Sequence, residues 1–198
     1  MTKPVFFLIV LSLSLSVRAQ GPDISILRNI NSQEALPSDD FFRFVNSSDY
    51  YFVAGLPVVL GVTGMITGDD DLLSASLTAA GACVINLGLT TVLKYGINRD
   101  RPFDTYPDIY KKTSAGSPSF PSGHTAFAFS SATSISLEYP EWYIIIPSFL
   151  WAGSVAYSGM HLGVHYPSDV LAGALTGALS AWLSYRITGL LRRESGKF

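Results

Sequence analysis

Residues Leu72–Leu93 read LLSASLTAAGACVINLGLTTVL, a run that contains no charged side chain. A run of about 20 mostly apolar residues is long enough to cross the hydrocarbon core of a bilayer as a helix. Backbone groups in lipid must be paired within the protein, and this run does not alternate every second residue as a barrel strand would. The stretch therefore predicts a membrane-spanning helix.

Four further apolar runs lie on the two sides of this stretch: Tyr50–Thr67, Thr125–Leu137, Trp142–Tyr157 and Val170–Ile187. The last run carries small residues at Gly173 and Gly177, a spacing that lets two helix backbones approach closely, so we assign this face to packing. The five runs together predict an all-α, polytopic membrane helix bundle with about five transmembrane helices, whose core covers residues 50–187.

The composition supports a membrane protein with one domain. Only 14% of the 198 residues are charged, against about 25% in a soluble globular chain. The net charge of −2 provides no basic field for nucleic acid, so the lipid bilayer is the expected partner. The single cysteine, Cys83, excludes an intramolecular disulfide framework and zinc-finger spacing.

The N-terminus has the features of a secretory signal peptide. Lys3 precedes an apolar run over Pro4–Val17, and the small residue Ala19 follows closely, so we expect cleavage after Ala19. The alternative is that residues 1–19 stay attached as a sixth transmembrane helix. Residues 20–49 are polar and mixed, and we expect a short extracytoplasmic surface helix or loop there.

The C-terminal tail indicates the orientation of the bundle. It is rich in basic residues, so residues 188–198 are expected on the cytoplasmic side. Counting back through the helices places Lys94–His124 and Tyr157–Asp169 outside, which agrees with the direction that a signal peptide sets. The basic residues between Lys94 and Lys112 then lie on the side where positive charge is unusual, so we expect them to serve a function.

Three outer segments carry the polar side chains that we expect to form a site: KYGINRDRP (Lys94–Pro102), PSGH (Pro121–His124) and SGMHLGVHYPSD (Ser158–Asp169). All three histidines of the chain lie in these segments. Each segment lies at a helix end on the same side of the membrane, so the three can meet in one pocket.

The residue types in these segments suit phosphate chemistry. Lys94 and Arg101 can hold a dianion, the arginine through its planar fork of donors. Ser122 and Gly123 open a helix, where free N–H groups and the positive end of the helix dipole bind phosphate. His124, at the same helix start, is placed to give a proton to a leaving oxygen.

His165 and Asp169 are four residues apart, so the carboxylate can hold one ring nitrogen and leave the other as a nucleophile. Taken singly, each feature has a simpler explanation. Lys94 suits an interfacial side chain, PSGH suits a helix cap, and the His–Asp pair suits a structural hydrogen bond or half of a metal site. Their joint occurrence favours a functional site.

The three motifs resemble those of the type 2 phosphatidic acid phosphatase superfamily, whose pattern is K-x6-R-P, P-S-G-H and S-R-x5-H-x3-D. This superfamily covers membrane lipid phosphatases, bacterial acid phosphatases and vanadium haloperoxidases. The resemblance implies a metal-independent phosphatase without a cofactor, in which His165 attacks phosphorus and forms a phosphohistidine, Asp169 orients it, and His124 protonates the leaving group. The residues implied to bind the phosphoryl oxygens are Lys94, Arg101, Ser122 and Gly123.

One position departs from this pattern. The superfamily has arginine after the serine of the third motif, and this chain has Gly159 after Ser158. Loss of one charge-assisted clamp on the phosphoryl group costs on the order of 3 kcal/mol, which is about 100-fold in rate. His161 and Arg99 are the candidates to replace it. The sequence thus permits a rewired enzyme, a slow enzyme or an anion-binding relative, and the retained motifs favour the first.

The expected function is that of an integral-membrane lipid-phosphate phosphatase in a bacterial envelope, with its site on the periplasmic face of the cytoplasmic (inner) membrane. The substrates compatible with the resemblance are phosphatidate, phosphatidylglycerol phosphate, undecaprenyl diphosphate and a lipid A phosphate. The alternatives are a soluble acid phosphatase or haloperoxidase, a membrane lipid-phosphate binder without turnover, and a transporter. Apolar spans argue against the soluble enzymes, and charged groups at helix ends argue against the transporter.

Overall fold

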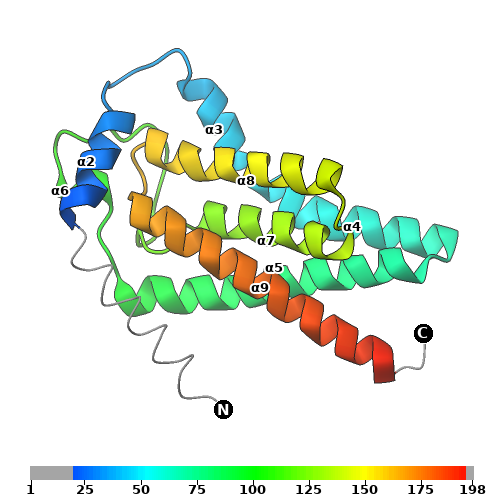
Figure 1. Ribbon diagram of the computed structural model, residues 1–198. Coiled ribbons are helices and arrows are strands. Elements are labelled where there is room, and N and C mark those ends of the chain that lie inside the picture. The colour runs from blue at the N-terminus through cyan, green and yellow to red at the C-terminus, as the bar shows by residue number, and fades with distance from the viewer. Residues whose placement is uncertain (1–19, 195–198) are drawn as a thin grey trace.

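The computed structural model describes residues 20–194, so the expected signal peptide over residues 1–19 lies outside the described part of the chain. Over the described residues the protein is all-helical, as the sequence predicts (Figure 1). The helices are α2 (Gln20–Ile30), α3 (Asp39–Ser47), α4 (Asp49–Thr67), α5 (Asp70–Ile97), α6 (Pro102–Thr105), α7 (Gly123–Glu138), α8 (Trp142–His161) and α9 (Pro167–Glu194).

Five of these helices correspond to the five apolar runs of the sequence. Helices α4, α5, α7, α8 and α9 each begin within three residues of their run. Among the described residues, two helical stretches, Asp39–Thr67 and Asp70–Thr105, are long and apolar enough to cross a membrane by length and composition. Since α7 has only 16 residues, the number of helices that cross a bilayer stays a prediction.

Helix α7 lies in the middle of the bundle and packs against α4, α5, α8 and α9 (Figure 1). Its crossing with α9 is close because of two glycines. A Cβ atom on Gly177 would overlap the carbonyl oxygen of Ala126, and one on Gly173 would lie 2.6 Å from the carbonyl oxygen of Ser122. The small-residue spacing predicted from the sequence therefore serves helix packing, because only glycine allows this approach.

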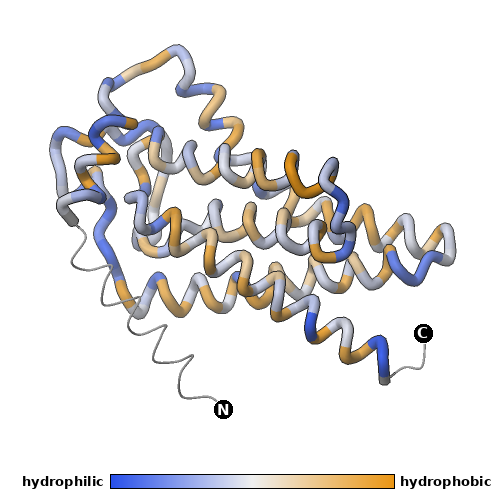
Figure 2. The backbone as a smooth tube through the Cα atoms, in the orientation of Figure 1, coloured by the Kyte–Doolittle hydropathy of each residue, from blue (hydrophilic) through white to orange (hydrophobic). Residues whose placement is uncertain are grey.

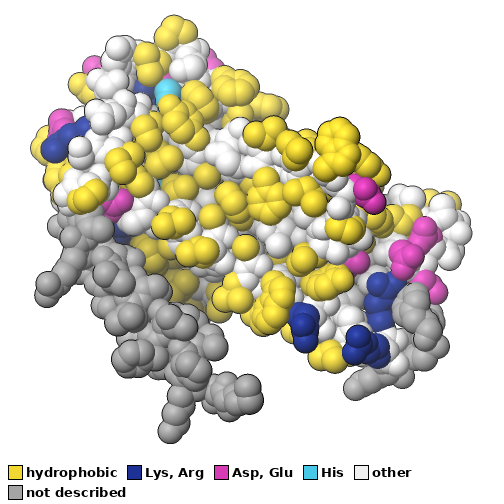
Figure 3. Space-filling view, in the orientation of Figure 1, with side chains coloured by type: hydrophobic (Ala, Val, Ile, Leu, Met, Phe, Trp, Pro, Cys, Tyr) yellow, Lys and Arg dark blue, Asp and Glu magenta, His cyan; other side chains and the backbone are white. Residues whose placement is uncertain are grey.

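The bundle buries small side chains and exposes large apolar ones. Thr78, Ala82 and Ala126 are fully buried, whereas Ile66 and Val84 are 80% and 72% exposed. In Figure 3 hydrophobic side chains spread over the sides of the helices, and charged side chains gather toward the ends. Lipid tails are as apolar as leucine, so large exposed side chains on the helix sides suit a bilayer rather than water.

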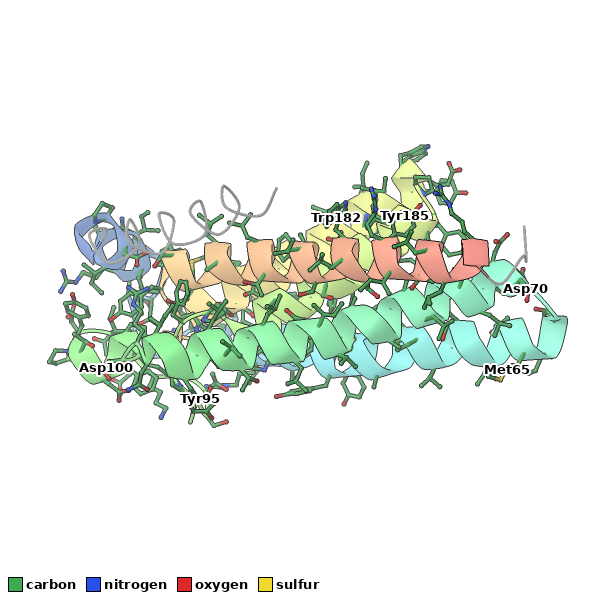
Figure 4. All side chains as sticks on the ribbon, turned by 90° about the horizontal axis from the view of Figure 1, so that it is seen from below. Met65, Asp70, Tyr95, Asp100, Trp182 and Tyr185 are labelled. Carbon is green, nitrogen blue, oxygen red and sulfur yellow. The ribbon has the colours of Figure 1, made fainter. Side chains whose placement is uncertain are left out.

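The hydrophilic segments lie toward the two ends of the bundle (Figure 2). Figure 4 shows Tyr95 and Asp100 at one end, and Met65 and Asp70 at the other. At the first end α5 stops at Asn98, whose left-handed backbone (φ 49°) closes the helix and turns the chain into the loop that follows. We call this the motif end, because the helix termini that carry the three sequence motifs all lie there.

Residues 20–47 lie over the motif end, where α2 and α3 approach α8 (Figure 1). Ile24 and Leu27 of α2 are buried in a cluster with Ile109 and Tyr166. Asn31 follows α2, and its Nδ2 atom donates to the carbonyl oxygens of Tyr110 in a neighbouring loop and of His161 at the end of α8. The sequence led us to expect a short surface helix or loop here. The structure instead has two helices, and α2 is packed onto the loops that form the site.

Candidate active site

The three motif segments are in contact with one another. Lys94 lies in the last turn of α5, and a Cβ atom on Gly123 at the start of α7 would lie 3.8 Å from its Cε atom. The amide of Ser122 donates to the carbonyl oxygen of Asp169 in the first turn of α9 (3.0 Å). The ends of α5, α7 and α9 therefore converge on one place.

His165 and Asp169 form the centre of this place. His165 lies between α8 and α9 and is only 2% exposed, and Asp169 is fully buried. The Nδ1 atom of His165 is 3.7 Å from Oδ2 of Asp169, beyond hydrogen-bond distance, and it has no hydrogen-bond partner among the described residues. Catalytic hydrogen bonds are often long before substrate binds, so this geometry is compatible with a pair that tightens on binding.

The carboxylate of Asp169 is held from three sides. Its Oδ2 atom accepts hydrogen bonds from Ser119 Oγ (2.5 Å) and the amide of Tyr166 (2.9 Å), and its Oδ1 atom accepts one from Arg99 Nη1 (2.7 Å). A buried carboxylate is costly unless it is paired and hydrogen-bonded, and these three donors meet that requirement. They also fix the direction in which the carboxylate faces His165.

The surroundings of His165 favour its neutral form. Burial lowers the pKa of the imidazole, the nearby negative charge of Asp169 opposes this shift, and the cations Arg101 and Lys94 lower the pKa further. The balance keeps the pKa below its usual value. The ring is therefore neutral near pH 7, and the neutral ring is the form that can attack phosphorus.

Two cations lie beside His165. Arg101 is buried. Its Nη1 atom donates to the carbonyl oxygen of Val164, next to His165 (2.8 Å), and its Nε atom donates to the Ser117 carbonyl oxygen (2.8 Å). Lys94 Nζ donates to the Pro118 carbonyl oxygen (2.7 Å). Carbonyl oxygens position these side chains without cancelling their charge, so both remain able to attract an anion.

The start of α7 adds backbone donors. Ser122 is the N-cap, and its Oγ atom shares a hydrogen bond with Thr125 Oγ1 (2.9 Å) and accepts one from the Thr125 amide. The amides of Gly123 and His124 lie in the first turn, where N–H groups have no acceptor within the helix. These groups and the positive end of the helix dipole make this terminus suitable for an anion next to Lys94.

His124 lies in the first turn of α7, before the apolar run begins, with its ring edge-to-face against Tyr50 at 5.5 Å. Burial lowers the pKa of His124 to about 4, and the neighbouring His165 and the positive charges of Lys94 and Arg101 lower it further. The ring is therefore neutral near pH 7. A phosphate dianion would offset these positive charges and favour the protonated form that a general acid needs.

Arg99 has a different position from the phosphate clamp considered in the sequence analysis. Its guanidinium binds the Asp169 oxygen that faces away from His165, and its Nη2 atom donates to Asp23 Oδ2 (2.9 Å). It also lies over the ring of Tyr166 at 3.8 Å. These contacts hold Arg99 behind the His–Asp pair, so the geometry does not favour it as a replacement for the missing arginine.

His161 is also held away from the nucleophile. Its Nε2 atom is 2.7 Å from Asp39 Oδ1, which also accepts a hydrogen bond from Lys112 Nζ (3.0 Å). Its ring packs against Phe42 at 4.2 Å. His161 therefore links α8 to α3, and it does not take the place of a phosphate ligand.

Gly159 adjoins the nucleophile. Its carbonyl oxygen accepts hydrogen bonds from the amides of Val164 (3.1 Å) and His165 (3.2 Å), and a Cβ atom on it would lie 3.4 Å from Cδ2 of His165. A side chain at this position would therefore begin in ordinary contact with the imidazole ring. The departure from the superfamily pattern thus lies directly beside His165.

Two residues of the site were missed by the sequence analysis. Ser119 donates to Asp169, and it lies just before the PSGH motif, so its nearness to a motif was a usable signal. Asp23 binds Arg99 from α2, and nothing in its local sequence distinguishes it from other acids. Its position depends on how residues 20–47 fold back over the motif end.

A buried histidine beside a carboxylate, with two cations and a second histidine at the ends of lipid-compatible helices, provides the residue types that phosphoryl transfer needs. The family model described as the PAP2 superfamily matches residues 73–193, more than half of the chain. The chain therefore belongs to the PAP2 superfamily, as the resemblance of its motifs predicted, and it is a phosphatase.

Named relatives agree with this class. An undecaprenyl-diphosphatase from Sulfolobus acidocaldarius is 27% identical over 202 residues, covering 96% of this chain and 93% of that protein. A lipid A 4'-phosphatase from Bacteroides thetaiotaomicron is 33% identical over 90 residues, covering 46% of this chain and 40% of that protein. Homologues of this chain are thus membrane lipid phosphatases, at modest identity.

Solved structures are similar over most of the chain. A transmembrane PAP2-type phosphatidylglycerolphosphate phosphatase from Bacillus subtilis has a TM-score of 0.74 at 26% identity, covering 98% of this chain and 99% of that one. LpxE from Aquifex aeolicus has a TM-score of 0.68 at 28% identity, covering 83% and 94%. The arrangement of the helices is therefore shared with membrane phosphatases.

Proposed function

We propose that this protein is an integral-membrane phosphatase that hydrolyses a phosphomonoester or diphosphate of a membrane lipid through a phosphohistidine intermediate. The observation that carries the proposal is the convergence of His165 and Asp169 with Lys94, Arg101 and His124 at one end of helices whose sides suit lipid. The site then lies on the periplasmic face of the cytoplasmic membrane, the orientation that the basic tail favours.

In the first step the free ring nitrogen of His165 attacks phosphorus while the bond from phosphorus to the leaving oxygen breaks. His124 gives its proton to that oxygen. The attacking ring becomes positively charged, and Asp169 at Nδ1 stabilises that charge, which is the task of the carboxylate in a histidine–aspartate pair. The product of this step is a phosphohistidine and the lipid alcohol or lipid monophosphate.

In the second step water attacks the phosphohistidine, and the bond between phosphorus and His165 breaks. His124, now neutral, takes the proton of the water and is ready for the next cycle. Lys94, Arg101 and the first amides of α7 bind the phosphoryl oxygens in both steps. These groups supply positive charge without a metal ion, so we propose a metal-independent reaction.

The substrate is proposed to be a lipid phosphate because relatives that cover nearly the whole chain carry names of this kind. One is named undecaprenyl-diphosphatase and another is a phosphatidylglycerolphosphate phosphatase. Phosphatidate, phosphatidylglycerol phosphate, undecaprenyl diphosphate and a lipid A phosphate are the candidates. The chain of each would lie in the bilayer while the phosphate reaches His165.

The test is phosphate release by the detergent-purified full chain, with a chelator present and with His165→Ala as the matched control. The panel contains the four lipid phosphates and one water-soluble phosphate monoester. We expect release from at least one lipid, none from the variant, and a clear preference for lipid over the soluble ester. Failure of the folded wild-type chain to release phosphate from any of them would overturn the proposal.

A second candidate is a lipid-phosphate binder without turnover. Gly159 favours it, because the superfamily arginine is absent beside His165, where a side chain would touch the ring. Binding of the lipid phosphates without release of phosphate, in a chain that unfolds cooperatively on heating, would select this candidate over the enzyme.

A further inference from the structure

Asp23 reaches the catalytic pair from α2, outside residues 73–193 that the family model matches. It is 5% exposed, and its carboxylate accepts hydrogen bonds from Arg99 Nη2 (2.9 Å) and the amide of Ser168 (2.9 Å). The Ser168 hydroxyl donates to the same carboxylate. The Asp23 carboxylate is therefore almost completely shielded from solvent, and it faces the start of α9.

Arg99 connects Asp23 with the catalytic carboxylate. Its Nη1 atom donates to Asp169 Oδ1 (2.7 Å) and to Ser168 Oγ (2.7 Å), and its side chain is 18% exposed. The other oxygen of Asp169 is the one that faces His165. Four charged or titratable groups thus follow one another in the order Asp23, Arg99, Asp169 and His165, with each in contact with the next.

We infer that Asp23 and Arg99 are positioning residues for the His165–Asp169 pair. Asp23 fixes the guanidinium of Arg99, and Arg99 fixes Asp169 and moderates the negative charge that His165 experiences. Neither residue touches the phosphoryl group. The inference rests on the proposed function, because it assigns these two residues to the nucleophile of that reaction.

If Asp23 and Arg99 act on the His165–Asp169 pair, their removal shifts the pKa of His165 in opposite directions, which a purely structural role would not produce. The other groups that face His165 are Asp169, Arg101, Lys94 and His124, and they stay unchanged in the variants below. Removing the positive charge of Arg99 leaves more of the Asp169 charge acting on His165, so protonation of the ring becomes easier. Removing the negative charge of Asp23 has the opposite effect.

The experiment compares Asp23→Asn and Arg99→Gln with Asp108→Asn in the detergent-solubilised full chain. Asp108 is a matched control, because it also ties α2 to the loop, through Arg28 (2.6 Å), but is exposed and does not touch Asp169. The titration of His165 is followed by NMR of labelled histidine, assigned with His165→Ala, and kcat and KM are measured against pH.

We expect the pKa of His165 to rise in Arg99→Gln, to fall in Asp23→Asn and to stay unchanged in Asp108→Asn. In the first two variants kcat should fall by about tenfold or more while KM changes little, because an interaction that acts in the transition state is weakened. Thermal unfolding of each variant separates these effects from loss of the fold.

Shifts in the same direction, or no shift, would overturn the inference. It would also be overturned if Arg99→Lys weakened inhibition by inorganic phosphate as much as Arg101→Lys does, since Arg99 would then be a phosphate ligand. If Arg99→Gln does not fold, the pKa of His165 in Asp23→Asn is the deciding measurement, because this variant keeps every cation of the site. The titration needs no turnover, so an inactive wild-type chain would refute the proposed reaction and leave this test intact.

Discussion

In the proposed reaction the two histidines of the site need opposite protonation states. His165 must be neutral to attack, and His124 must be protonated to donate, yet burial and neighbouring cations lower the pKa of both. The phosphate dianion resolves this conflict, because it adds negative charge beside His124 when the substrate is bound. Substrate binding thus prepares the acid of its own reaction.

The lowered pKa of His165 sets the acid limb of the pH profile. Since protonation removes the nucleophile, kcat/KM should fall as the pH falls through a midpoint below 6.5, the ordinary value for histidine. Asp169→Asn removes the charge that favours protonation, so it should move this midpoint lower still and reduce the plateau by on the order of 10⁴. The measurement is kcat/KM between pH 4 and 9, and an acid limb centred above 6.5 would contradict the assignment.

Gly159 offers a second test at a single position. Its Cβ position makes only ordinary contact with His165, so Gly159→Ala should keep most of the activity. Gly159→Arg restores the arginine of the superfamily, and it should strengthen inhibition by inorganic phosphate by about tenfold through one more charge-assisted bond. If Gly159→Arg abolishes activity while Gly159→Ala retains it, another group of this chain already occupies that part of the pocket.

Single residues mark the limit of prediction from this sequence. His165, Asp169, His124, Lys94 and Arg101 could be identified because each lies in a motif with a chemical reason for its spacing. The positions of His161, Arg99 and Asp23 could not, because each of them binds a partner that is far away in the chain. Charged residues next to a motif look alike in sequence, and only tertiary packing separates a phosphate ligand from a positioning group.

At the scale of the helices, the crossing of α7 and α9 sets the distance between His124 and Asp169. Both residues lie in first turns, and glycines keep the two helices close below them. Gly177→Val should therefore push α9 away from α7, lower the free energy of unfolding by about 1–3 kcal/mol and reduce kcat.

The matched control for this prediction is Gly189→Ala in the same helix, where an added Cβ would meet nothing within 4 Å. It should leave activity unchanged and raise stability slightly, since alanine favours helix. Thermal unfolding in detergent and phosphate release measure both variants. An unaffected Gly177→Val would show that the crossing tolerates a wider separation.

The helices themselves were predictable, because a long apolar run in lipid must pair its backbone groups within the protein and therefore forms a helix. Charged residues and glycines mark where the runs end. The run that became α4 ends at Gly68, and Asp69 caps α5 by accepting from the amides of Asp71 (2.9 Å) and Leu72 (3.1 Å). Helices α2 and α3 were not predicted in detail. Their residues are polar and mixed, and they become ordered through contacts with loops that are distant in sequence.

At the scale of the whole molecule, the bundle has two polar ends, and the basic C-terminal tail predicts that the motif end faces the outside of the membrane. With Cys83→Ser as the background, a cysteine at exposed Ser114, in the loop of the motif end, should react with a membrane-impermeant maleimide added outside the cells. A cysteine at exposed Glu141, in the turn between α7 and α8, should react only after the membrane is permeabilised. Reversed labelling would place the site on the cytoplasmic side.

The bonds from Asp23 to Ser168 join residues 145 positions apart. While the protein is being synthesised, α2 is among the first described helices to emerge, and its partner on α9 is among the last. The hydrogen bonds of Asp23 to Ser168 can therefore form only after the chain has been synthesised through the start of α9. His165, the proposed nucleophile, lies just before α9, so we expect a nascent chain to have no phosphatase activity until α9 has joined the bundle.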